Sequence, residues 1–194
     1  MDLGIDYPFQ SWVSGVQGDF GDCLDGKGYL PEHDPIKVEI LFEFKTHNKA
    51  SFAKLKKEGM KLSKPQHYAQ CCVYGYKMKL NYVCYVAVNK DDDDLHFEIV
   101  ELNHNTGAML EIKAEKIIIS QEPPPRLNEN PNMFLCKMCS YRHICHADGK
   151  PEQNCRSCKH AKPANDKKWI CTKFNQELTK EIIVGKYQCW ECIC

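Results

Sequence analysis

Hydrophobic and polar residues alternate clearly over residues 38–46, and this pattern predicts a β-strand. Four apolar side chains fall on one face of that strand: Val38, Ile40, Phe42 and Phe44. Glu43 and Lys45 share the opposite face with Leu41, so we expect the all-apolar face to be the core side. Two opposite charges on a half-buried strand are costly to desolvate unless they are paired or bind something. The pattern is typical either of an ion pair on an edge strand or of a ligand-binding or catalytic site.

Upstream of this strand, residues 12–24 alternate loosely and are rich in glycine, which is typical of strands that bend. Asp25-Gly26 predicts a turn, and the loop that continues through residues 28–35 ends before the next strand. Residues 13–46 are therefore expected to form an antiparallel hairpin or meander. This arrangement leaves Asp25 at a strand end near Glu43.

Two helices are predicted next. Residues 51–61 form a lysine-rich helix with Ser51 as its expected N-cap. Residues 63–76 form a second helix, in which Ser63 and Gln66 have capping-box spacing. One face of this second helix carries three polar side chains at positions i, i+3 and i+7: His67, Gln70 and Tyr74.

The remaining pattern completes a fold class. Residues 80–89 and 95–102 predict a hairpin joined by an acidic turn, and residues 105–120 predict a helix that the prolines at 123–125 terminate. This order predicts an α/β fold with a mixed central sheet flanked by helices over residues 1–127. A small cysteine-rich region is expected to follow over residues 128–194.

Composition narrows the function classes. Lys and Arg total 26 and so do Asp and Glu, so binding of nucleic acid would rest on a local basic patch, of which residues 45–64 are the candidate. Neither a membrane-spanning run nor an export signal is apparent, so we expect a cytoplasmic protein without a membrane partner. The sequence also has no glycine-rich nucleotide-binding loop, so a nucleotide-cofactor fold is unsupported. It has no nucleophile elbow, so acyl transfer has no candidate nucleophile.

Nine of the 13 cysteines lie from residue 136 onward, in a segment with too little apolar surface to fold unaided. One set has the spacing of a structural zinc site with four thiolates: Cys155, Cys158, Cys171 and Cys189. Three residues are alternative ligands: His160, Cys192 and Cys194. A rival zinc grouping joins Cys136 and Cys139 to the first pair, Cys155 and Cys158.

Taken together, these positions resemble the PD-(D/E)XK nuclease superfamily, and within it RecB-type nucleases of a phage exonuclease-like group. The resemblance is carried by residues 18–26, by the Glu43-x-Lys45 pair, by the Gln70-x-x-x-Tyr74 motif and by the cysteine spacings. It implies a restriction-endonuclease-like core followed by a zinc-ribbon-like tail. It also implies a phage-encoded protein that acts in a bacterial host.

The resemblance further implies a Mg²⁺-dependent (or Mn²⁺-dependent) DNA exonuclease in phage recombination, replication or repair. The metal would be held by Asp25, Glu43 and the Phe44 carbonyl, and Lys45 would activate the attacking water or stabilise developing charge. The polar stripe of the second helix would orient the nucleophile or contact the phosphate backbone: Gln70, Tyr74 and His67.

In such relatives an N-terminal helical segment precedes the region that starts this chain, and a His stands where Asp19 lies here. We expect a separate chain to supply the missing first motif, or the domain to bind without cutting. The segment would also carry the fourth ligand of a [4Fe-4S] cluster whose other three ligands match Cys136, Cys139 and Cys145. Cys23 and His146 are substitutes for that ligand.

The alternative function is a catalytically incomplete nucleic-acid-binding or partner-docking module stabilised by zinc. A zinc-ribbon transcription regulator ranks below both, because it leaves the pairing of Glu43 with Lys45 unexplained.

Overall fold

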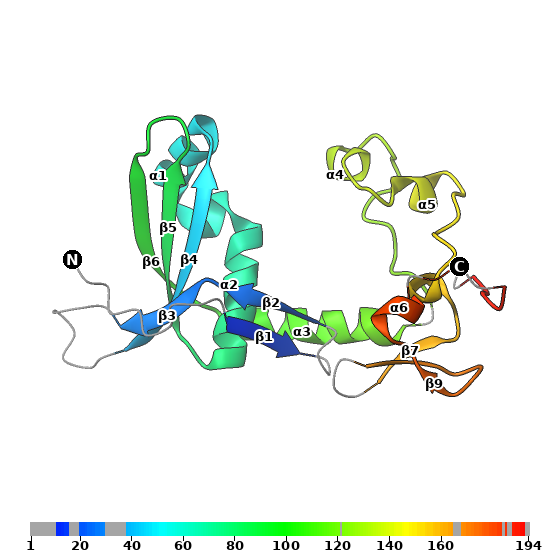
Figure 1. The fold of residues 1–194 in the computed structure, drawn as a ribbon. Helices are drawn as coiled ribbons and strands as arrows, with labels where there is room; N and C mark the ends of the chain where they lie inside the picture. The colour runs from blue at the N-terminus through cyan, green and yellow to red at the C-terminus, as the bar shows by residue number, and fades with distance from the viewer. Residues whose placement is uncertain are drawn as a thin grey trace. The chain divides into compact units, whose positions relative to one another are not determined.

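The structure is a computed structural model that describes residues 11–15, 20–29, 38–120, 122–164, 168–183, 185 and 188–192. It divides into two compact units, Met1–Glu115 and Lys116–Cys194 (Figure 1), whereas the sequence placed the boundary after residue 127. Three features expected from the sequence lie outside the described residues: most of the loop before residue 38, Asp19 and Cys194.

The first unit is built on a mixed four-stranded sheet in the order β3-β4-β5-β6 (Figure 1). Its strands are β3 (Gly26–Tyr29), β4 (Glu39–His47), β5 (Tyr82–Asn89) and β6 (Leu95–Glu101). The central pair, β4 and β5, is parallel, and both outer pairings are antiparallel. A separate antiparallel pair joins β1 (Ser11–Gly15) to β2 (Phe20–Leu24). The expected α/β class with a mixed sheet flanked by helices is confirmed.

Two helices connect the parallel strands: α1 (Lys49–Ser63) and α2 (Pro65–Met78). They pack against the sheet face that carries Leu41, and this is where the main core lies, with Leu55, Cys71 and Tyr85 fully buried. The expected core side was therefore wrong for the main core, although Ile40 and Phe42 on the predicted face are buried as well. Parallel neighbours need a crossover connection, and the crossover helices cover the face that also carries Glu43.

The other face of the sheet is only partly covered within the described residues. Ile40, Phe42 and Cys84 form a small cluster there. Several apolar side chains around this cluster are 38–74% exposed: Phe44, Tyr82, Leu95, Phe97 and Ile99. The strand register places them on one face, because Phe44 lies in line with Val86 and Phe97 across the three strands. This outer sheet face is a substantial apolar surface.

Local signals near the site differ from the sequence predictions. Asp25 and Gly26 form no turn; Asp25 is the single residue between β2 and β3, so the chain passes from one sheet into the next at this point. The N-cap of α1 is Asn48, whose side chain accepts a hydrogen bond from the Ser51 backbone at 2.9 Å. Ser63 does not cap α2, because its hydroxyl donates to the Gly59 carbonyl at 2.6 Å.

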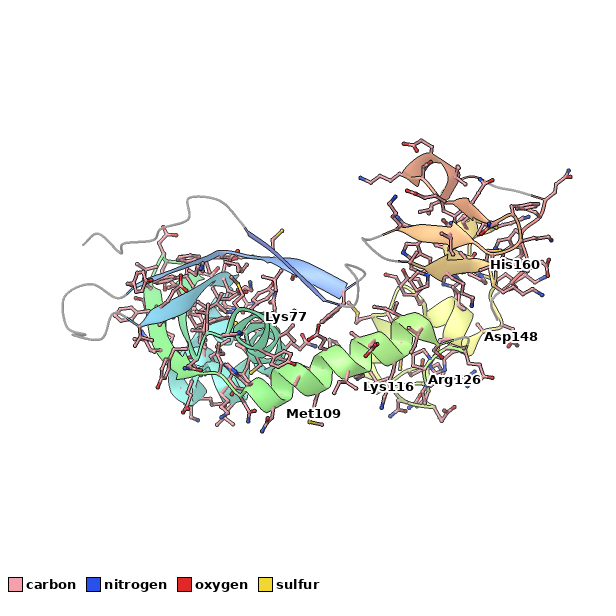
Figure 2. The ribbon with its side chains drawn as sticks, turned by 90° about the horizontal axis from the view of Figure 1, so that it is seen from below. Lys77, Met109, Lys116, Arg126, Asp148 and His160 are labelled. Atoms are coloured by element: carbon pink, nitrogen blue, oxygen red, sulfur yellow. The ribbon has the colours of Figure 1, made fainter. Side chains whose placement is uncertain are left out.

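Helix α3 (His104–Ile119) packs on α2 through a very close approach at Gly107. A Cβ atom at that position would lie 2.3 Å from the Cys72 carbonyl oxygen. Lys77 of α2, labelled in Figure 2, donates to Glu111 of α3 at 2.6 Å. Met109, also labelled there, is 70% exposed, so the apolar positions of α3 are not all core positions.

The second unit contains small elements. Three short strands form an antiparallel sheet: β7 (Ala161–Pro163), β8 (Trp169–Cys171) and β9 (Gln176–Glu177). Its helices are equally short: α4 (Phe134–Lys137), α5 (Arg142–His146), η2 (Cys155–Ser157) and α6 (Lys180–Ile183). Among the described residues of both units, no helix is long and apolar enough to cross a membrane.

The close approach of α3 to α2 gives a testable expectation. Gly107→Ala should lower the free energy of unfolding by about 1–3 kcal/mol, because a methyl group this close to a backbone carbonyl forces the helices apart. The clash outweighs the better helix propensity of alanine, which is worth about 1 kcal/mol. Urea denaturation checks this, with Lys113→Ala on the exposed side of α3 as the control. Equal or higher stability of Gly107→Ala would contradict the packing described.

Candidate functional site

The candidate site lies where β3 separates from β4. The antiparallel pairing of these strands extends only to Gly26 and Phe42, and the chain turns toward β2 at Asp25. The next backbone amide of β4 on that side belongs to Phe44, and it donates to Asp25 Oδ2 at 2.9 Å. In a strand, the N–H and C=O groups of one residue point to the same neighbour, so the Phe44 carbonyl is directed to this side as well.

Three sequence-predicted site residues meet at this opening. The Lys45 ammonium is hydrogen-bonded to Glu43 Oε1 and lies 4.0 Å from Asp25 Oδ2. Asp25 and Lys45 are partly exposed, whereas the Glu43 side chain is only 1% exposed. The structure thus joins two acids and an amine that are separated by up to 20 positions in the sequence.

Glu43 is the most constrained of the three. Its Oε2 atom is buried and has no hydrogen-bond partner among the described residues. Burial raises the pKa of Glu43; the Lys45 ammonium opposes this rise, and the negative charges of Asp25 and Asp22 add to it. An orphaned carboxylate oxygen beside a second carboxylate has the chemistry of a hard-cation ligand set. A divalent cation would satisfy the oxygen and offset the repulsion.

Gln70 and Tyr74 of α2 face the same region and bind to β2. The Gln70 amide donates to Tyr74 Oη at 2.9 Å and to Asp22 Oδ2 at 2.8 Å. Tyr74 in turn donates to the Cys23 carbonyl at 3.1 Å. Tyr74 is 2% exposed, and burial raises the pKa of its hydroxyl. These contacts hold β2, and therefore Asp25, beside β4.

Asp22 is a residue that the sequence prediction missed. It lies three positions before Asp25, and its Oδ2 accepts from Gln70 at 2.8 Å. Its charge also acts on Glu43, so it belongs to the electrostatic surroundings of the site. The spacing of two aspartates within one strand end was the available signal.

His67, the third residue of the stripe, has different partners. Its Nδ1 atom lies 2.7 Å from the Tyr85 hydroxyl on β5. Burial, followed by the positive charge of Lys45 and further positive neighbours, lowers the pKa of His67 to about 4. The imidazole is therefore neutral at physiological pH. His47, which stacks on His67 at 5.8 Å between ring centroids, also has a lowered pKa because of its burial.

In the second unit, the expected zinc ligands surround one small cavity of about 20 Å³. Its lining includes Cys155, Cys158, Cys171 and Cys189, together with His160 (labelled in Figure 2). Burial raises the pKa of the Cys155 thiol, and the charges of the other three cysteines raise it further. The His160 ring already lies 3.0 Å from Glu191 Oε1, so four sulfurs are the better-matched donor set.

Cys136 and Cys139 do not line this cavity, and their rival grouping with Cys155 and Cys158 stays a prediction. Cys136 is nearly buried in α4, and Cys145 lies in α5. The Nε2 atom of the neighbouring His146 is buried and has no hydrogen-bond partner in the described part of the chain. Cys192 pairs through its backbone with Cys158.

Across the described ranges, no three His, Cys, Asp or Glu side chains stand in an arrangement that could hold a metal ion as it is. Zinc, an iron-sulfur cluster and magnesium therefore stay predictions. The donor chemistry fits a hard cation at Glu43 and a thiophilic one at the four-cysteine cavity.

Comparisons with known proteins add little. No protein-family model matches the chain, and no curated protein does. A solved structure titled "Crystal structure of SSO0001" matches with 19% sequence identity and a TM-score of 0.42. The match covers 73% of this chain and 59% of that one.

The raised pKa of Glu43 predicts a pH-dependent gain in stability on removing its charge. The folded state keeps this proton to higher pH than the unfolded state does, so the ionised carboxylate opposes folding above the raised pKa. In buffer without divalent cations, Glu43→Gln should raise the Tm at pH 8 by roughly 2–4 °C, the shift that about 1 kcal/mol produces in a chain of this size. The gain should vanish as the pH falls through the raised pKa.

Calorimetric melting between pH 4 and pH 8 checks this. The control is Glu39→Gln on the same strand, whose carboxylate is paired with Lys27 at 2.7 Å. Adding Mg²⁺ should raise the Tm of the unmodified chain but not that of Glu43→Gln. If Glu43→Gln raised the Tm equally at every pH, the gain would not come from the loss of the Glu43 charge, and the prediction would be wrong.

The four-cysteine cavity predicts a bound zinc ion that the second unit needs in order to fold. Cys158→Ser should lose the zinc and the circular dichroism of the tail, because three thiolates bind the ion more weakly than four. Cys84→Ser, in the sheet of the first unit, should retain both. Elemental analysis measures the zinc content. A purified chain without zinc, or a Cys158→Ser chain with full zinc content, would be evidence against this site.

Proposed function

We propose that the chain is a metal-dependent deoxyribonuclease of the PD-(D/E)XK type, an exonuclease of phage DNA recombination, replication or repair. One observation carries the proposal: Asp25, Glu43 and Lys45 meet at the opening of the sheet, and one buried oxygen of Glu43 has no partner among the described residues. A structural ion pair needs only one carboxylate for one amine. The second carboxylate and the orphaned oxygen are accounted for by a cation.

In this proposal Mg²⁺ or Mn²⁺ would be held by the Asp25 and Glu43 carboxylates and the Phe44 carbonyl. The ion would supply Lewis acidity toward the scissile phosphate and make water acidic enough to attack it. The Phe44 amide orients Asp25 through the 2.9 Å hydrogen bond to its Oδ2 atom, which, within the described residues, leaves Oδ1 for a cation. Glu43 is fixed by burial, so little of its side-chain entropy remains to be lost on binding.

Lys45 is the residue that acts on the phosphate. Its ammonium is shared between Glu43 and Asp25, and its side chain is 28% exposed, so it can reach a ligand in the opening. Once a cation neutralises the carboxylates, the ammonium is available to stabilise the negative charge that develops on phosphorus. The buried core beneath the site has a lower dielectric constant than water, so this charge interaction is stronger there than it would be in water.

Other residues hold the arrangement or approach the DNA. Gln70 and Tyr74 keep β2 in place, so they act on the position of Asp25. Exposed lysines of α1 would meet the phosphate backbone nonspecifically: Lys49, Lys54, Lys57 and Lys61. The restriction-endonuclease-like core and the zinc-ribbon-like tail belong to the same proposal.

A second candidate is a module that binds DNA or a partner and is catalytically incomplete. The exposed outer sheet face with Phe97 and Ile99 favours it, because such apolar surfaces are usually covered by another polypeptide.

Cleavage of DNA tests the proposal directly. The purified chain should release nucleotides from linear DNA with Mg²⁺ or Mn²⁺ and lose that activity in EDTA. Glu43→Ala and Lys45→Ala should each reduce the rate by roughly 10²–10⁴-fold, the range for removing a group that acts in the transition state.

The matched controls are Glu39→Ala and Lys27→Ala, which remove an acid and an amine of the same sheet away from the opening. Both controls should cleave at nearly the unmodified rate. Cleavage that survives Glu43→Ala or Lys45→Ala would exclude these residues from the active site. DNA binding without cleavage by the unmodified chain would favour the second candidate.

A further inference from the structure

A chain of polar side chains runs from α1 through the core to His67. Lys64 Nζ contacts Ser51 Oγ, which lies 3.4 Å from His47 Nδ1. His47 Nε2 lies 2.9 Å from the Tyr85 hydroxyl, which lies 2.7 Å from His67 Nδ1. Tyr85 is fully buried and His47 is 8% exposed, so these contacts are largely shielded from water.

The first member of this chain has one possible direction. An ammonium group donates hydrogen bonds and accepts none, so Ser51 Oγ must be the acceptor from Lys64. Lys64 also donates to the Ser51 carbonyl at 3.1 Å, which fixes the ammonium beside this residue. Among the described residues, His47 Nδ1 is the one acceptor found for the Ser51 hydroxyl hydrogen, so the arrangement that satisfies this hydrogen directs it to Nδ1.

The remaining hydrogens follow from that step. A neutral imidazole carries one hydrogen, so His47 with an accepting Nδ1 carries it on Nε2 and donates to Tyr85 Oη. Tyr85 has a single hydroxyl hydrogen, which it then donates to His67 Nδ1. His67 must therefore carry its own hydrogen on Nε2. Because Nδ1 is occupied by Tyr85, Nε2 is the ring atom left for a ligand.

We propose that Tyr85, His47, Ser51 and Lys64 form a positioning relay that fixes His67 as a neutral Nε2–H donor to a DNA phosphate oxygen. His67 stands on the same face of α2 as Gln70, and the charge of Lys45 acts on it. This role rests on the proposed nuclease function and deepens it. The relay members act through His67, so they are positioning residues.

The electrostatic surroundings agree with the geometry. Burial and the charges of Lys45 and Lys64 lower the pKa values of both imidazoles, so that neither ring is doubly protonated at neutral pH. A second hydrogen on His67 Nδ1 would point at the hydroxyl hydrogen of Tyr85 and break the directed chain. The neutral ring in one tautomer is the state in which all these contacts are satisfied.

The experiment is long-range ¹H–¹⁵N NMR of the imidazole rings at pH 7, on the full chain with Ca²⁺ in place of Mg²⁺. The unmodified chain should show the Nε2–H tautomer at both His47 and His67. In Tyr85→Phe, the Nδ1 nitrogen of His67 loses its donor, so its ¹⁵N shift should move toward that of an unbonded imine and the second tautomer should appear. Ser51→Ala should have the same effect on His47.

The matched control is Tyr68→Phe, which removes another hydroxyl of the core, one that donates to the Glu101 carbonyl at 3.2 Å. It should leave the His67 signals unchanged. Adding a short DNA duplex should shift the His67 Nε2–H signal in the unmodified chain. With Mg²⁺, Tyr85→Phe should reduce kcat by up to roughly tenfold, the factor expected for the loss of one neutral hydrogen bond that positions His67.

A hydrogen on His67 Nδ1 in the unmodified chain would overturn the relay, and so would a tautomer that does not respond to Tyr85→Phe. An Nε2–H signal that DNA does not move would overturn the phosphate contact. These outcomes are independent of cleavage. A chain that shows the tautomers and the DNA-induced shift but does not cleave would refute the nuclease function and leave the relay intact.

Discussion

The organisation of the first unit depends on a buried carboxylate, Glu43, in the middle of the sheet. Leu41 on the same strand face is fully covered by the crossover helices, so Glu43 shares the environment of the main core. Burying such a charge is tolerated only when it is compensated, and Lys45 compensates one of its two oxygens. The other oxygen has no hydrogen-bond partner among the described residues, so it is available to a cation. The raised pKa of Glu43 has the same cause, because burial without full compensation disfavours the charged carboxylate.

The surroundings of Glu43 are arranged to hold this unfavourable group in place. The Phe44 amide binds Asp25, while Gln70 and Tyr74 hold β2 from the helix side. The Tyr85 hydroxyl joins the imidazoles of His47 and His67 by hydrogen bonds within the same core. Stability is thus reduced at one buried position and recovered through polar contacts around it, which is the pattern expected of functional sites.

The sequence predicted the meeting of Asp25 with Glu43, because strand ends that are close in a meander bring their side chains together. It did not predict which face of β4 carries the main core, since alternation alone does not reveal that β4 and β5 are parallel and joined by two helices. The sequence analysis predicted Ser51 as the N-cap of α1, whereas the structure has Asn48, about one helical turn earlier. The sequence pattern did not single out Tyr85, whose two histidine partners come from β4 and α2 and meet it only in the folded chain.

In the tail, the spacing of cysteines predicted the four that line one cavity. The Cys155-x-x-Cys158 turn brings two sulfurs together, and the pairing of β7 with β8 adds Cys171. The spacing could not assign partners to Cys136, Cys139 and Cys145, for which the described residues provide no complete ligand set. Because the region has so few buried apolar side chains, we expect its stability to depend on such a ligand.

The central claim is that the orphaned oxygen of Glu43 is a ligand for a hard cation. Anomalous X-ray diffraction from crystals soaked in Mn²⁺ measures this most directly. The account predicts a manganese peak in contact with the carboxylates of both Asp25 and Glu43, and its loss in Glu43→Gln. Bound manganese elsewhere with none between these two carboxylates, or Asp25 and Glu43 too far apart to share one ion, would contradict it.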